Sequence, residues 1–73
     1  MKLQIVLYLP RHEQRITLHT EGPIRLKDVY SQIDMDRWSE KDVLATFNGE
    51  VCFADDLLQE DGELDILPLL SGG

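Results

Sequence analysis

The chain has 73 residues, of which 42% are hydrophobic and 29% charged, a composition typical of a small globular domain. A single domain of this size buries only about 60% of the surface of its unfolded chain, so little room is left for an enclosed substrate pocket, and we do not expect a free-standing enzyme. Apolar runs are far shorter than the ~20 residues of a membrane-spanning helix, and the first residues alternate instead of resembling a signal peptide. We therefore expect a cytoplasmic protein.

Charge is distributed unevenly along the chain. The formal net charge is −7, and residues 42–73 hold eight acidic and no basic residues. Such a field repels nucleic acid and anionic lipid and steers the molecule toward a basic protein surface. We therefore expect a protein partner, and neither nucleic acid nor a membrane.

The reactive side chains do not form a catalytic or metal-binding set. A single cysteine, Cys52, cannot form an internal disulfide, and its distance in sequence from His12 and His19 gives no zinc spacing. Nothing near Cys52 in sequence would lower the pKa of its thiol. No acidic pair has the ligand spacing of a calcium loop, so we expect no bound metal or cofactor.

The first half of the chain predicts a β-hairpin followed by a helix. Residues 3–9 and 15–20 alternate between apolar and polar side chains, and residues 10–13 indicate the turn between them. Apolar residues at helical spacing predict an amphipathic helix over 26–33. So short a helix is unstable alone, so we expect it to pack on the sheet, with Trp38 covering the edge of the core.

The second half predicts three strands separated by turns. We expect these strands at residues 43–47, 51–53 and 63–67. Asn48-Gly49 is typical of a two-residue hairpin turn, and Asp61-Gly62 predicts a second tight turn. Between them, residues 55–58 resemble one helical turn capped by Asp55.

The order of elements predicts an α+β fold, in which one helix packs across a mixed sheet of four or five strands. The domain is expected to span residues 1–68, because Pro68 ends the last strand. Residues 69–73 would then form a flexible C-terminal tail with nothing to pair with. Fully extended, this tail would reach roughly 17 Å, enough to carry its carboxylate into a site on another protein.

Strand alternation also predicts a partner surface on the face of the sheet opposite the helix. The expected apolar patch comprises Val6, Tyr8, Leu44 and Leu67, next to Leu69 and Leu70 in the tail. Asp61 and Glu63 are expected to provide an acidic rim. An apolar patch with such a rim suits reversible docking to a basic enzyme surface.

The chain ends in two glycines, Gly72 and Gly73, which chance would produce well under 1% of the time because glycine is about 7% of residues. A glycine carboxylate is unhindered, and a backbone without Cβ atoms can pass through a narrow channel. The main chain could therefore present its terminal carboxylate to ATP in an activating enzyme.

Three segments make the chain resemble the ThiS/MoaD sulfur-carrier family, which has the ubiquitin-like β-grasp fold. They are Phe47-Asn48-Gly49-Glu50-Val51, Asp61-Gly62-Glu63-Leu64 and the ending Pro68-Leu69-Leu70-Ser71-Gly72-Gly73. The resemblance implies a protein cosubstrate and not an enzyme. A ThiF/MoeB-type enzyme would adenylate Gly73 with ATP and magnesium, and a sulfur donor such as a cysteine desulfurase would help convert it to a thiocarboxylate. Residues 69–72 would pass through the partner's channel.

The resemblance leaves the pathway open. The Asn-Gly-Glu turn is closer to the thiamine carriers, which serve thiazole synthase. The proline before two apolar residues and Ser-Gly-Gly is closer to the small subunits of molybdopterin synthase, which serve its large subunit. Two alternatives also remain, namely a ubiquitin-like modifier conjugated through Gly73 and a non-covalent β-grasp interaction module. We expect a monomer when the chain is free.

Overall fold

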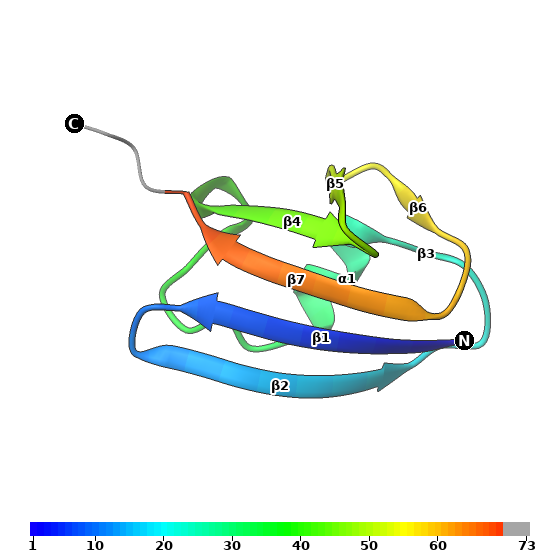
Figure 1. Cartoon of the computed structure of the whole chain (residues 1–73), viewed down its shortest axis with the longest axis horizontal. Coiled ribbons are helices and arrows are strands. Elements are labelled where there is room, and N and C mark those ends of the chain that lie inside the picture. Colours follow the sequence, from blue (N-terminus) through cyan, green and yellow to red (C-terminus); the bar gives the residue numbers. More distant parts are fainter. Residues whose placement is uncertain (70–73) are drawn as a thin grey trace.

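Five strands form one mixed sheet in the order β2-β1-β7-β4-β5 (Figure 1). The computed structural model describes residues 1–69, and residues 70–73 lie outside this description. Its elements are β1 (Lys2–Leu9), β2 (His12–His19), β3 (Ile24–Arg25), α1 (Leu26–Gln32), η1 (Glu40–Asp42), β4 (Val43–Phe47), β5 (Glu50–Cys52), β6 (Leu57–Leu58) and β7 (Gly62–Pro68). Within residues 1–69, no helix is long and apolar enough to cross a membrane.

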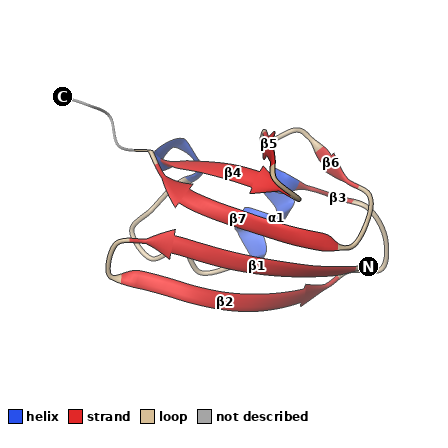
Figure 2. Ribbon diagram, viewed as in Figure 1, coloured by secondary structure: helices blue, strands red, loops and turns tan. Residues whose placement is uncertain are grey.

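The sheet is mixed because β1 and β7 run parallel at its centre, while the other neighbours are antiparallel. Figure 2 shows α1 on one face of this sheet. The predicted α+β architecture, with a mixed sheet and a helix across it, is therefore confirmed and is consistent with a β-grasp-like fold.

The core lies between α1 and the sheet. The alternating residues of β1 that were predicted to face the helix are buried, as are the apolar residues of α1 and β7. Fully buried side chains include Leu3, Ile5, Leu7, Leu9, Leu26, Val29, Leu64 and Ile66. Trp38 packs against this cluster at its edge, as predicted. Burying each large aliphatic side chain contributes roughly 1.5–3 kcal/mol, which holds the short helix in place.

Both hairpins close through two-residue turns. Asn48 and Gly49 have positive φ values of 51° and 88°, the conformation that matches the right-handed twist of the flanking strands. The first hairpin turns at Pro10 and Arg11, so β2 begins at His12 and not at residue 15. The residues at the start of β2 are strand residues with exposed or half-buried polar side chains, and because the segment is polar it was assigned to the turn.

The predicted helical turn over residues 55–58 is wrong. Residues 53–56 form a tight turn, in which the Asp56 carboxylate accepts a 2.7 Å hydrogen bond from the backbone N–H of Phe53. Leu57–Leu58 is a strand, β6, which pairs with β3 in a separate two-stranded sheet. The first amides of α1 donate to backbone carbonyls of this turn region, so the helix begins without a side-chain cap.

The connection before β4 also differs from expectation. It ends in a 3₁₀ turn, η1, instead of a purely irregular loop. The carbonyl of Asp42 accepts a 2.8 Å hydrogen bond from the N–H of Leu69. Leu69 was predicted to have nothing to pair with, and that prediction is wrong for this residue because its N–H bonds to η1, one position beyond the last pair of β4 with β7.

Candidate functional site

The candidate site lies where β7 ends and the chain continues toward its C-terminus. Because β1 and β7 are parallel, the end of β7 lies beside the end of β1 and across from the start of β4 (Figure 1). Leu69 is the last described residue and its side chain is 51% exposed. The other predicted tail residues, Leu70, Ser71, Gly72 and Gly73, lie outside the described part of the chain.

Three of the predicted patch residues form a row across the outer face of the sheet next to Leu69. Leu44 pairs directly with Leu67. The parallel register that joins Leu7 to Ile66 places Tyr8 beside Leu67 on the other side. Tyr8 is 42% exposed, and the two leucines are half-buried. We call Tyr8, Leu44 and Leu67 the outer row.

Val6 lies on the same face of the sheet, but its side chain is too buried to contact a partner. Its side chain is only 2% exposed, although it is not part of the core cluster beneath the sheet. In the register, Val6 is flanked by Arg15 of β2 and by Asp65 of β7. Longer side chains on both neighbouring strands therefore enclose a short one on a central strand. The prediction that Val6 adds to an uncovered patch is wrong.

Asp61 and Glu63 do not rim the outer row. Asp61 comes just before β7 and Glu63 lies near its start, so roughly 26 Å and 20 Å of extended chain separate them from Leu69. The Asp61 carboxylate accepts a 2.8 Å hydrogen bond from the N–H of Lys2. The charged neighbour of Tyr8 is instead Glu13, directly opposite on β2. Sequence reasoning missed Glu13 because it placed this residue in a turn.

A groove of about 280 Å³ adjoins Leu69 and is also lined by Leu44 of the outer row. Its lining is mainly apolar and includes Tyr30, Val43, Cys52, Phe53 and Leu69. Phe53 is 66% exposed, the largest value among the exposed large apolar side chains of the described residues. Burial, and secondarily Asp56, raises the pKa of the Cys52 thiol, so little thiolate is present near neutral pH.

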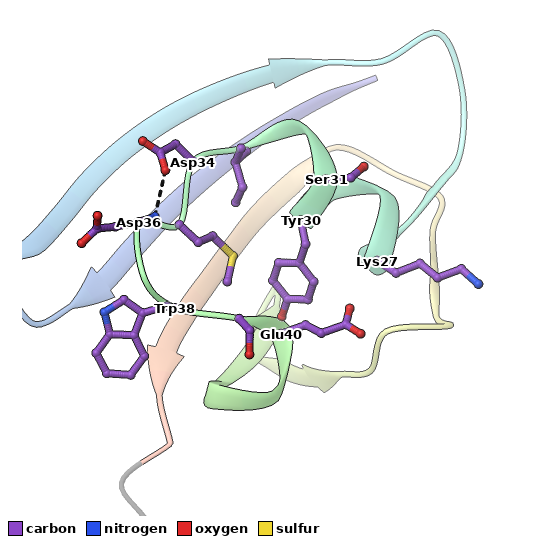
Figure 3. A pocket seen from close by; sticks show the side chains of 10 residues that line it. Lys27, Tyr30, Ser31, Asp34, Asp36, Trp38 and Glu40 are labelled. Atoms are coloured by element: carbon purple, nitrogen blue, oxygen red, sulfur yellow. Dashed lines mark hydrogen bonds between the residues drawn. The ribbon is translucent and has the colours of Figure 1, made fainter.

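A second pocket, of about 460 Å³, lies between α1 and the connection that follows it (Figure 3). Its lining includes two aromatic rings and three carboxylates, Tyr30 and Trp38 with Asp34, Asp36 and Glu40. The Asp34 carboxylate accepts a 2.8 Å hydrogen bond from the N–H of Asp36. Burial raises the pKa of Tyr30 to about 12, with smaller contributions from Cys52 and Glu40, so the phenol stays protonated.

The histidines lie apart from the thiol. His12 Nε2 lies 3.0 Å from the carbonyl oxygen of Asp34, and His19 is exposed near the other end of the sheet. Among the described residues, no three histidine, cysteine or acidic side chains are grouped to hold a metal ion. The arrangement can present to a partner an apolar surface with the exposed Leu69 beside it.

Comparison with known proteins gives no match, either to a protein-family model or to a curated protein. The resemblance to the sulfur carriers therefore depends on the three quoted segments and on the fold.

Proposed function

We propose that this chain is a sulfur carrier with a ubiquitin-like β-grasp fold, whose Gly73 carboxylate is adenylated and then converted to a thiocarboxylate. The observation that carries the proposal is a glycine pair four residues beyond a strand that is held on both sides. β7 lies between β1 and β4, so the body of the domain gives the last residues a fixed origin. The half-exposed Leu69 and the outer row lie at that origin.

The chemistry follows from the weakness of a carboxylate as an electrophile. A carboxylate oxygen of Gly73 would attack the α-phosphorus of ATP, and pyrophosphate would leave. A sulfide equivalent would then attack the acyl carbon, forming a C–S bond as the C–O bond to AMP breaks. With sulfide itself as the nucleophile, no oxidation or reduction is needed. The resulting thiocarboxylate is a nucleophile that a synthase could use in thiazole or molybdopterin formation.

The outer row supports docking to a ThiF/MoeB-type activating enzyme and then to a synthase. Its apolar surface is modest, which suits exchange between successive partners. The net charge of −7 favours basic partner surfaces at a distance. Glu13 beside Tyr8, and not Asp61 or Glu63, is the acidic residue positioned to contact such a surface.

Intact-mass spectrometry tests the proposal. The chain is incubated with ATP, magnesium, a ThiF/MoeB-type enzyme and sulfide, beside a chain that lacks Gly73. We expect a mass gain equal to the exchange of one oxygen for sulfur in the full chain only. An unchanged mass with enzymes of both types would contradict the carrier proposal and favour a non-covalent module. Attachment of the chain to lysines of other proteins would identify a modifier instead.

A matched pair of variants tests the docking surface in the same assay. Tyr8→Ser removes the most exposed side chain of the outer row, whereas Val51→Ser makes a similar change at a 52% exposed residue of β5. We expect Tyr8→Ser to lower kcat/KM for adenylation roughly tenfold, as loss of a partly buried aromatic anchor does, and Val51→Ser to leave it unchanged. Equal effects would exclude the outer row as the docking surface.

A further inference from the structure

We propose that the turn over residues 39–42 positions the base of the C-terminal segment for the activating enzyme. The inference rests on the proposed function, and it concerns residues on which that proposal does not depend. The N–H of Leu69 donates a 2.8 Å hydrogen bond to the carbonyl of Asp42. Leu69 is therefore tied to a segment that lies outside the sheet.

The turn is itself braced by one side-chain pair. The hydroxyl of Ser39 donates to Asp42 Oδ2 at 3.0 Å, and the N–H of Ser39 donates to the same oxygen at 3.1 Å. The N–H of Asp42 donates to the carbonyl of Ser39 at 2.9 Å. Three hydrogen bonds thus hold Asp42, whose carbonyl accepts the bond from the Leu69 N–H. Two of the three use the Asp42 carboxylate.

The hydrogen bond between Leu69 and Asp42 lies just beyond the last pair of β4 with β7. The register pairs Val43 with Pro68, so Asp42 and Leu69 continue the ladder one pair past the end of both strands. Without that bond, Pro68 would be the last described residue of this segment to be paired across to the β4 side. Because the backbone of Leu69 is fixed in advance, binding to the enzyme does not have to offset the entropic cost of ordering this residue. Ser39 and Asp42 are therefore positioning residues, since neither side chain belongs to the surface proposed to dock.

Hydrogen exchange of the Leu69 amide tests the geometry without any enzyme. In the full chain, Ser39→Ala removes the hydroxyl bond to Asp42 and leaves the backbone bonds in place. We expect exchange at Leu69 to become roughly fivefold faster, the effect of losing about one hydrogen bond. Ser39→Thr keeps the hydroxyl and should restore slow exchange. Ser31→Ala removes an equivalent exposed hydroxyl, one that donates to the carbonyl of Asp28, and should leave Leu69 unchanged.

Steady-state adenylation then tests the positioning. Ser39→Ala should raise KM for the chain roughly fivefold with kcat unchanged. The turn lowers the cost of binding, and once the C-terminal segment is bound the enzyme itself holds it in place. Ser39→Thr should restore KM. Unchanged exchange at Leu69, faster exchange without a change in KM, or a fall in kcat alone would each overturn the proposal. Absence of adenylation of the wild-type chain would overturn the proposed function and with it the positioning, whereas the exchange result would still report whether the turn holds Leu69.

Discussion

Gly62 and Asn48 form a contact that can be tested by mutation. The Asn48 side chain lies over the α-carbon of Gly62, so a Cβ added at Gly62 would come within 2.7 Å of Asn48 Cγ and closer still to its amide oxygen. The same amide oxygen accepts a 2.9 Å hydrogen bond from the N–H of Glu63. The N–H of Asn48 donates to the carbonyl of Glu63 at 2.9 Å, which joins the β4–β5 turn to the start of β7.

Gly62→Ala should therefore destabilise the domain, although alanine is usually the better residue in a strand. Displacing the exposed Asn48 side chain loses one hydrogen bond, worth about 0.5–1.5 kcal/mol, and moves the side chain off its preferred rotamer at a cost of about 0.5–1.5 kcal/mol. The gain from removing a glycine offsets about 0.5–1 kcal/mol. The net loss is about 1 kcal/mol, or a decrease in Tm of roughly 4–8 °C for a domain of this size.

A double-mutant cycle in urea isolates the contact. Asn48→Gly removes the obstructing side chain and still allows the positive φ that the turn needs. In that background, Gly62→Ala should cost nothing or stabilise the domain by about 0.5 kcal/mol. If Gly62→Ala costs the same with and without the Asn48 side chain, the two residues are not coupled and the reasoning is refuted.

Two further predictions concern Tyr30 and Val6. Because the pKa of Tyr30 rises from 10.0 to about 12, the folded chain keeps a proton that the unfolded chain loses, so the stability it contributes below pH 10 should fall between pH 10 and 12. The loss is about 1 kcal/mol after allowance for solvent screening, and urea unfolding of Tyr30→Phe should lack it; equal pH slopes would contradict the assignment. Val6→Ala should lower the free energy of unfolding by about 1–2 kcal/mol and Val51→Ala by less than about 0.5 kcal/mol, because Val6 is 2% and Val51 52% exposed. Urea titrations giving equal losses would mean that Val6 is not enclosed.

Local patterns predicted the elements whose structure is decided locally. The alternation of residues 3–9 indicates which side chains of β1 face the helix, and Asn48-Gly49 indicates its hairpin, because both depend on neighbouring residues. The mixed sheet follows from the element order. The short segment 55–58 was misassigned because its acidic start fits a helix cap equally well. Its actual structure depends on pairing with β3, more than 30 residues away.

The candidate site was predictable in part. Alternation placed Tyr8, Leu44 and Leu67 on one face, and the register brings them together. Alternation gives the face of a residue but not its exposure, so it could not show that neighbouring strands enclose Val6. Nor does it give position along a strand, which is why Asp61 was expected beside a surface that lies about 20 Å away.

The parallel pairing of β1 with β7 determines how the domain bears a pulling force. The N-terminal end of β1 and the C-terminal end of β7 lie at opposite ends of the pair (Figure 1). A force that draws the C-terminus away while the N-terminal end is held slides one strand along the other. The register pairs from Leu3–Gly62 to Leu7–Ile66 then share the load at the same time, whereas a hairpin pulled from its open end separates one pair after another. A pull on the C-terminal end of β7 against a held N-terminal end of β1 therefore loads the whole strand pair and does not peel β7 from the sheet.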